Sequence, residues 1–364
     1  MAFLEFKNVR IAGVAAGVPK NVASNLHPSD QDNISHDYTP EEYVKTTGVE
    51  ERRVSNVLTT ADLSYAAAEK LIEDLNWDKN EIGALLFVSQ TPDYVLPATA
   101  CILQDRIGLN KECYAADISL GCSGWVYGLS AALGLLGENK VKKALILCGD
   151  AKKRFRIEGN QLRDPLFGSA GTATAVEYRE GEEGCKFHFG TDGSGFDAII
   201  TPDMGARNPV KENSFAFEDY EGKPSCRLMT RMKGMDVFSF GITTAPKSVK
   251  KLAEHYGFNY LDADYYIFHQ ANMKMNNMIA KKLKLAPEKV PSCMYHFGNT
   301  SSASIPLTIV GELRGKFENV PTKFICCGFG VGLSWGTVAF ETKNIVVSNL
   351  VEVSDEEIDS KYVV

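Results

Sequence analysis

The stretch that organises the chain is DISLGCSGW, residues 117–125. A strand-like run from Cys113 to Leu120 leads into a Gly-Cys-Ser-Gly elbow, and an apolar pattern with the spacing of a buried helix face follows from Trp125. A cysteine at such an elbow lies near the positive end of the helix dipole, which favours the thiolate. The flanking glycines permit a tight turn and leave room beside the sulfur. Cysteine is also a common core residue, so a structural thiol and a nucleophile both stay open for Cys122.

The composition is that of a globular protein. The 364 residues are 44% hydrophobic and 23% charged, which suits one large α/β domain or two packed halves. The net charge of −7 argues against nucleic acid as the main partner. No apolar run approaches the roughly 20 residues of a membrane helix, and Met1–Arg10 carries Glu5 and is predicted to be a strand rather than a signal peptide. Nine cysteines without metal-ligand spacing predict a cytoplasmic protein with no metal site.

Strands are predicted to alternate with helices along the chain. The apolar runs predict strands at residues 10–18, 83–89, 113–120, 144–148, 171–178, 264–268, 324–327 and 333–341. The helical patterns cover residues 61–76, 97–108, 125–136, 235–256, 272–283 and 302–317. Because the strands are continuously apolar and separated by helices, we expect α/β sheets that are buried on both faces.

Three parts are predicted: an N-terminal half at residues 1–180, a C-terminal half at 181–342 and an extension at 343–364. The segment from Pro202 to Arg227 is polar and contains several glycines and prolines, which indicates a long surface connection and a candidate cover over a site. The extension is acidic at residues 355–357 and is expected to be loosely held.

A nucleophilic cysteine needs a base or cation nearby, usually histidine. Among six histidines, His269 follows an apolar strand and begins the tetrapeptide His-Gln-Ala-Asn. A polar residue at the end of a parallel strand faces the crevice where α/β proteins bind ligands. A structural histidine with satisfied hydrogen bonds is the alternative, and His269 alone does not exclude it.

Two more stretches carry polar or glycine-rich chemistry. HFGNTSSAS, residues 296–304, fits either a helix N-cap or an amide donor directed at a developing oxyanion. GFGVG, residues 328–332, fits either a simple hairpin or a loop that presents backbone N–H groups to a substrate. It lacks the GxGxxG spacing and precedes no helix, so a dinucleotide site is not predicted.

In this order, the four stretches resemble the β-ketoacyl-acyl-carrier-protein synthase III family of thiolase-fold condensing enzymes. The resemblance covers about residues 9–340 and extends to TGVEERR, GCSG, FGSAG, HQAN, GNTS and GVGLSWG, which begin at residues 47, 121, 167, 269, 298 and 330. It implies a thiolase-like α/β fold with two similar halves in five layers, α-β-α-β-α. It also implies a homodimeric acyltransferase of fatty acid biosynthesis that uses malonyl-acyl carrier protein and no cofactor.

The resemblance assigns catalytic roles to single residues. Cys122 would carry the primer acyl group as a thioester, and the N–H groups of Cys122 and Val331 would form the oxyanion hole. His269 and Asn299 would hydrogen-bond the thioester carbonyl of the malonyl group while carbon dioxide leaves. Because decarboxylation places negative charge on a carbonyl oxygen, two fixed donors serve this step better than a strong base.

The same resemblance implies supporting roles for five further residues. Phe329, Gly330 and Gly332 would surround the nucleophile. Leu96 lies in a segment that would reach the partner subunit's acyl pocket and act as its gate. Lys274 aligns with a basic position that docks the acidic carrier protein, and a solvated helix face is the alternative for this lysine.

Three features depart from the family pattern. Glu42 and Thr46 stand where enzymes primed by acetyl-CoA carry a Trp and an Arg that hold coenzyme A. An acidic residue would repel a nucleotide phosphate, so we expect a different primer, carried by coenzyme A or by a carrier protein. Val331 replaces a glycine and would be strained if the turn needs a positive φ. The extension at residues 343–364 has no counterpart in the usual pattern.

Other functions fit parts of the pattern. A specialised condensing enzyme of secondary metabolism is the main alternative, because of Glu42 and Thr46. A biosynthetic thiolase shares the fold, and the stretch Cys326-Cys327-Gly328 is similar to the surroundings of its second, C-terminal cysteine, but thiolases use a different histidine motif. Elongating synthases use two histidines, and Asn299 stands in the place of the second one, which argues against that class. An inactive acyl-binding homologue would not need the intact Cys122, His269 and Asn299 set, and a thiol hydrolase would need a water-activating base that is not evident.

Overall fold

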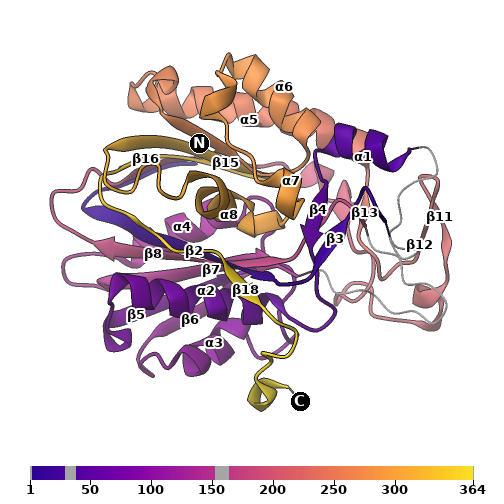
Figure 1. Ribbon diagram of the computed structural model, residues 1–364, viewed down its shortest axis with the longest axis horizontal. Helices are drawn as coiled ribbons and strands as arrows, with labels where there is room; N and C mark the ends of the chain where they lie inside the picture. Colours follow the sequence, from indigo (N-terminus) through magenta and orange to yellow (C-terminus); the bar gives the residue numbers. More distant parts are fainter. Residues whose placement is uncertain (1, 29–37, 152–163, 364) are drawn as a thin grey trace.

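The computed structural model describes residues 2–28, 38–151 and 164–363, and it has five layers in which two sheets alternate with three layers of helices (Figure 1). The strands of the seven-stranded sheet are, in spatial order, β17 (Val346–Val347), β2 (Val9–Pro19), β8 (Ala170–Tyr178), β7 (Lys143–Asp150), β5 (Ile82–Val88) and β6 (Tyr114–Ile118), and β18 (Val351–Val353) also pairs with β2. The five-stranded sheet has the order β1 (Ala2–Phe6), β9 (Cys185–Thr191), β16 (Ser334–Thr342), β15 (Thr322–Gly330) and β14 (Tyr265–Phe268). The predicted five-layer α/β class is confirmed.

The helices divide into a middle layer and two outer layers. Between the sheets lie α4 (Gly124–Leu135) and α8 (Ser304–Thr308); α5 (Gly234–Tyr256) and α6 (Met273–Leu283) cover one outer face, and α2 (Thr60–Leu75) and α3 (Thr99–Ile107) cover the other (Figure 1). The middle helix α4 contacts strands of both sheets, and its side chains Trp125, Val126 and Leu129 are buried. A helix between two sheets must be apolar on more than one face, as α4 is.

Smaller elements gather at one end of the layers, at the right of Figure 1. They are α1 (Pro40–Thr47), the pair β3 (Val22–Ser24) and β4 (Glu51–Arg53), α7 (Met294–Phe297), and the pairs β10 (Ile199–Ile200) with β13 (Arg231–Met232) and β11 (Glu218–Tyr220) with β12 (Lys223–Ser225). Local sequence explains α1: Thr39 and Glu42 form a capping box at its start, and Gly48 ends it with φ of 78°.

Most predicted elements match the structure within a few residues. One helix was predicted too long, and one strand was missed. The helix expected at residues 302–317 is a short α8 that continues as one π-helical stretch, Ile309–Leu313, and stops there. The strand β9 was not predicted. It contains the polar residues Lys186 and His188. His188 is buried, and its ring has a hydrogen-bond partner there because Nδ1 lies 2.8 Å from Ser248 Oγ.

The two sheets exchange strands between the halves of the chain. β1 pairs antiparallel with β9 and so joins the sheet of the C-terminal half, while β17 and β18 pair with β2 in the other sheet. The domain boundaries at residues 180 and 342 stay predictions.

The extension is firmly docked, so the expectation that it is loosely held is wrong. Both β17 and β18 run parallel to β2, the Ser348 N–H donates to Val14 O at 3.0 Å, and the Lys20 N–H donates to Val353 O at 2.9 Å. Val347 and Val353 are buried. These apolar residues complete the edge of the sheet, an effect that outweighs the acidic residues at 355–357.

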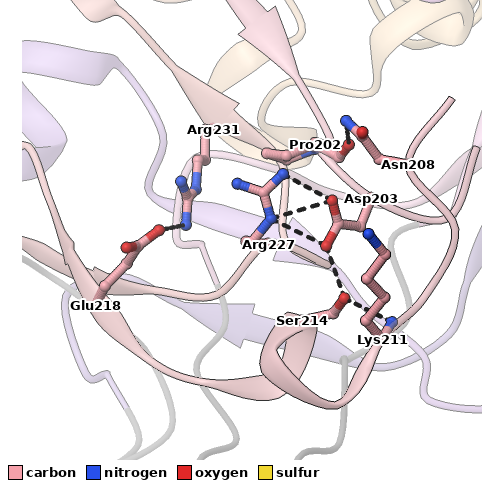
Figure 2. A network of polar contacts seen from close by, with 8 residues as sticks. All are labelled: Pro202, Asp203, Asn208, Lys211, Ser214, Glu218, Arg227 and Arg231. Carbon is pink, nitrogen blue, oxygen red and sulfur yellow. Dashed lines mark hydrogen bonds and ion pairs between the residues drawn. The ribbon is translucent and has the colours of Figure 1, made fainter.

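The polar connection at residues 202–227 is a loop whose two ends are held together by hydrogen bonds (Figure 2). The Asp203 N–H donates to Arg227 O at 3.1 Å, and the Arg227 guanidinium donates to both carboxylate oxygens of Asp203 at 2.8–3.1 Å. Ser214 Oγ donates to the same carboxylate at 2.7 Å. The hydrogen bonds from Arg227 and Ser214 hold the pKa of Asp203 below its ordinary value. The connection is therefore a self-contained surface element, and its role as a cover stays a prediction.

Candidate active site

Cys122 lies at the predicted elbow between β6 and α4, with its thiol partly exposed. The elbow is closed by a hydrogen bond from the Gly124 N–H to Gly121 O at 2.7 Å. Ser123 Oγ lies 2.7 Å from Ser334 Oγ, which ties the elbow to β16 in the other sheet. The nucleophile candidate therefore lies between the two halves, at the start of the buried helix α4.

The end of β15 packs directly against this elbow. A Cβ atom added to Gly330 would lie 2.5 Å from Cys122 Cβ and 2.7 Å from its Sγ, and one added to Gly328 would lie 2.8 Å from Cys122 O. On the other side, a Cβ on Gly121 would lie 2.3 Å from Gln90 Oε1. Real Cβ atoms do not approach other atoms so closely, so Gly328 and Gly330 leave no room for a side chain in the tight packing around the thiol, whereas at Gly121 the flexible end of the Gln90 side chain can move.

The glycine turn after β15 does not strain Val331. Among the described residues, the positive φ angles of this turn belong to Gly330 (159°) and Gly332 (130°), and Val331 is not in the positive region. The condition for the expected strain is therefore not met. The Val331 carbonyl accepts a hydrogen bond from Ser334 Oγ at 2.8 Å, which fixes the orientation of the turn.

His269 follows β14 and is buried, with 2% of its surface exposed. Its backbone N–H donates to Cys327 O at 2.9 Å, and its Nδ1 lies 2.9 Å from Ser304 Oγ. Its ring meets the Phe329 ring edge-on, with 5.8 Å between the ring centres. Burial lowers the pKa of His269 to about 4, although a hydrogen bond with the Ser301 backbone and the charge of Asp150 oppose this shift. The imidazole is therefore neutral at pH 7.

Asn299 is buried and held from both its backbone and its side chain. The Asn299 N–H donates to Leu166 O at 2.9 Å, and the Asn299 carbonyl accepts from the Gly168 N–H at 3.2 Å. Asn299 Oδ1 accepts from the Ser301 N–H at 2.9 Å, while Nδ2 makes only a long 3.5 Å contact with Ala271 O. Because the oxygen is already engaged, the amide is oriented to use Nδ2 as a donor.

A chain of contacts joins the three candidate catalytic residues. Gly330 packs on Cys122, and the adjacent Phe329 meets the ring of His269. Ser301 hydrogen-bonds the side chains of both His269 and Asn299. Cys122 follows β6 of the seven-stranded sheet, whereas His269 follows β14 of the five-stranded sheet, so the candidate site draws its residues from the ends of both sheets.

Three residues next to the site were not singled out from the sequence. Ser301 has a left-handed backbone with φ of 54°, which is costly for a residue with a side chain and is found where surrounding contacts impose it. Ser304 holds the ring of His269. Asp150 ends β7 and accepts hydrogen bonds from Ser89 Oγ, the Gln90 N–H and Thr91 Oγ1 at 2.8–3.2 Å. An acidic residue directly after an apolar parallel strand was the available signal for Asp150.

The residues predicted for substrate and partner contacts lie outside this cluster. Leu96, on the loop between β5 and α3, is 80% exposed, and its neighbour Val95 is 99% exposed. Lys274 is exposed near the start of α6, with Nζ 6.0 Å from the centre of the Phe238 ring. Glu42 is also exposed, but its carboxylate accepts a hydrogen bond from the Thr39 N–H at 2.9 Å and so closes the first turn of α1.

Two kinds of feature were sought in the described ranges 2–28, 38–151 and 164–363. Within them, no group of three or more His, Cys, Asp or Glu side chains is arranged to hold a metal ion. No helix in these ranges has both the length and the apolar character needed to cross a membrane.

Folding stability should depend on pH through His269. The unfolded chain binds a proton at this histidine below about pH 6.5, while the folded protein does so only below about 4, so stability falls as the pH drops between these values. Relative to a His269→Asn variant, the wild type should lose about 2 kcal/mol more between about pH 7.5 and 5. Urea unfolding at both pH values measures the difference. Equal losses of stability in the two proteins would show that the folded state does not lower the pKa of His269.

Similar proteins were found by sequence and by structure. A family model described as 3-oxoacyl-[acyl-carrier-protein (ACP)] synthase III matches residues 116–193, and the model of its C-terminal part matches residues 253–342. A β-ketoacyl-[acyl-carrier-protein] synthase III of Clostridium acetobutylicum is 32% identical over 92% of this chain and 98% of its own length. A protein of the same name from Bacillus pumilus is 30% identical over 91% of this chain and 98% of its own.

Solved structures have the same architecture. The crystal structure of a 3-oxoacyl-(acyl-carrier protein) synthase from Burkholderia xenovorans matches with a TM-score of 0.87 and 34% identity, and covers 97% of this chain and 99% of its own. A priming β-ketosynthase from the R1128 polyketide pathway matches with a TM-score of 0.79 at 21% identity, over 94% of this chain and 99% of its own, and so shares the fold.

Proposed function

Because the chain belongs to the 3-oxoacyl-[acyl-carrier-protein] synthase III family of condensing acyltransferases, we propose that it joins an acyl primer on Cys122 to the malonyl group of a carrier protein. The products are a 3-oxoacyl carrier protein and carbon dioxide. The observation that carries this proposal is the chain of contacts between a partly exposed Cys122 and the buried, neutral His269 and oriented Asn299.

The first step transfers the primer to the enzyme. The Cys122 thiolate attacks the thioester carbonyl of the primer, an S–C bond to Cys122 forms, and the bond to the carrier sulfur breaks. The negative charge that develops on the carbonyl oxygen faces the N–H groups of Cys122 and Val331 as oxyanion hole. The N-terminus of α4 favours the thiolate, and Gly330, which has no side chain, packs directly against its sulfur. The carrier leaves as a thiolate, which takes up a proton from solvent.

The second step forms the new carbon–carbon bond. The malonyl carboxylate leaves as carbon dioxide, and its bonding electron pair becomes an enolate whose oxygen accepts hydrogen bonds from His269 and Asn299. The enolate carbon attacks the acyl carbonyl on Cys122 and expels the thiolate, which is ready for the next primer. Since charge develops on an oxygen and no proton is removed from carbon, a neutral imidazole is a suitable partner.

The partner that supplies the malonyl group is an acidic carrier protein, and Lys274 is its proposed contact. Lys274→Glu should raise the KM for malonyl carrier protein about three- to tenfold while kcat at saturation stays unchanged, because a rim charge acts mainly on encounter. Steady-state kinetics with carrier-protein and small-thioester malonyl donors measure the effect. Lys281→Glu, on the last turn of the same helix, is the matched control. An equal loss in both variants would remove the specific role of Lys274.

The exposed loop supports a homodimer. Val95 and Leu96 are 99% and 80% exposed in a single chain, and this adjacent pair of exposed apolar side chains is what a contact with a second copy would cover. We place Leu96 in the acyl pocket of a second copy. All nine cysteines are free thiols, which suits a reducing compartment and the cytoplasm.

A specialised condensing enzyme with an unusual primer is the second candidate. Glu42 and Thr46 are exposed on α1, where related enzymes hold coenzyme A with other side chains. The Glu42 carboxylate accepts a hydrogen bond at the start of the helix and lies at the surface. A primer on a carrier protein would avoid a nucleotide phosphate beside this residue.

One experiment tests the proposed function and separates the primers. The protein is incubated with acyl-CoAs and acyl carrier proteins of increasing chain length, and the mass of the Cys122 peptide is measured. We expect a stable acyl adduct on Cys122 from a subset of these donors. No adduct from any donor would exclude a Cys122-dependent condensing enzyme.

A further inference from the structure

We infer that the last ten described residues of the extension hold the loop that carries Leu96, and thereby set which primer lengths the enzyme accepts. We call residues 354–363 the C-terminal brace and residues 89–98 the gate loop. The inference rests on the proposed function, because it assigns Leu96 to the acyl pocket of a second copy. It concerns the selection of hydrophobic acyl primers, not the chemistry at Cys122.

The brace is fixed along its path from β18 to α3 (Figure 1). Asp355 accepts hydrogen bonds from Ser55 Oγ at 2.6 Å and Asn21 Nδ2 at 3.2 Å. Ile358 packs with an apolar cluster that includes Leu58 and Leu63. These contacts bring the chain across the start of α2 and direct its final turn, Ser360–Tyr362, onto α3.

The final turn is anchored on α3 by charged and aromatic contacts. Lys361 Nζ lies 2.7 Å from Asp105 Oδ2, and Tyr362 OH donates to the same oxygen at 2.9 Å. The Arg106 guanidinium lies 5.8 Å from the centre of the Tyr362 ring. One exposed ion pair contributes little, but an ion pair, a hydrogen bond and a cation–π contact on adjacent residues fix the position of the turn.

This anchored turn contacts the gate loop at its tip. Tyr94 OH donates to Tyr362 O at 2.8 Å, and Tyr94 directly precedes the exposed Val95 and Leu96. The start of the gate loop is held by the protein body, because Asp150 accepts a hydrogen bond from Ser89, and the Asp93 N–H donates to Thr99 Oγ1 of α3 at 3.1 Å. The hydrogen bond from Tyr94 to Tyr362 therefore links the middle of the gate loop to the brace.

Primer length is sensitive to the position of such a gate. One methylene in an apolar pocket changes kcat/KM by about 10- to 200-fold, so a small displacement of Leu96 alters the preferred chain length. Removing the hydrogen bond between Tyr94 and Tyr362 weakens the hold of the brace on the tip and should let the partner's pocket accept longer primers. The decarboxylation donors His269 and Asn299 are not touched by the brace and should work as before.

The test compares Tyr94→Phe and a chain ending at Val353 with the wild type. We expect the ratio of kcat/KM for long over short acyl donors to rise at least about threefold in both, in the same direction as in Leu96→Ala. Malonyl decarboxylation should stay within about twofold of wild type. Hydrogen exchange of residues 92–98 should become faster. Lys79→Met is the matched control, because it removes an ion pair with Glu69 at the opposite end of β5.

The outcomes separate the two proposals. If Leu96→Ala changes the ratio but Tyr94→Phe and the shortened chain do not, the brace has no role in selection. If the shortened chain does not fold, Tyr94→Phe decides the same question, because it removes a single hydroxyl. If Cys122 of the wild type takes no acyl group from any donor, the proposed function fails, independently of the brace variants.

Discussion

A Cys122→Ala variant should lose condensation by about 10⁴-fold or more while it still decarboxylates the malonyl group at a rate within about threefold of wild type. The thiolate is the group that holds the primer, so no other side chain replaces it. Decarboxylation depends on donors to the malonyl carbonyl, and His269 and Asn299 keep their partners Ser304 and Ser301 in this variant. Product formation and carbon dioxide release, measured in parallel, test both halves of this expectation.

Cys101→Ala is the matched control, because Cys101 is an exposed thiol on α3, outside the elbow that carries Cys122. It should keep both activities and still take one acyl group on Cys122. A Cys122→Ala protein that condenses at the wild-type rate would mean that another group carries the primer. One that loses both activities equally would mean that the thiol also shapes the decarboxylation site.

The fold was predictable wherever burial imposes a simple pattern. Strands such as β5 and β7 lie inside the protein, so their residues are apolar almost without interruption. β9 was missed because His188 makes its pattern polar, and only the tertiary contact with Ser248 explains that residue. The end of the helix after Ser304 was misplaced because a π-helical stretch has no clear signal in composition.

The docked extension shows a second limit of sequence reasoning. Its valines are too few to indicate strands by themselves, and they are strands because β2 offers a free edge beside them. β1 shows the same dependence, because residues 2–6 pair with residues 185–189 of β9, which are far away in sequence. Pairings between distant segments depend on the assembled sheet and not on local pattern.

The site was predictable as a set of residue types, but not as a set of contacts. Cys122, His269 and Asn299 each ended an apolar run or stood in a polar stretch, and each had a structural alternative. What the sequence did not contain is the neutral state of His269, which depends on burial, and the orientation of Asn299, which depends on the backbone of Ser301. Val331 would have been strained only if the turn required a positive φ at this position, and Gly330 and Gly332 take the positive angles instead.

His269→Ala and Asn299→Ala should each lower malonyl decarboxylation by about 10²–10³-fold, the typical effect of losing one donor to a developing oxyanion. Both variants should still take the primer on Cys122, since neither residue takes part in acylation under the proposed mechanism. The decisive measurement is therefore a pair: the carbon dioxide release rate and the mass of the acylated Cys122 peptide. A variant that loses acylation as strongly as decarboxylation would instead act through the structure of the elbow.

The double variant tests whether the two donors act on one carbonyl. If they do, removing both should cost less than the product of the single effects, on the order of 10³–10⁴-fold, because the second donor has little left to stabilise once the geometry is lost. His188→Asn is the control for removal of a buried, neutral histidine, since His188 lies in β9 and its pKa is also lowered to about 4 by burial. Its decarboxylation rate should stay close to wild type. A multiplicative double effect would mean that His269 and Asn299 stabilise charge on different atoms, and the shared enolate contact would be wrong.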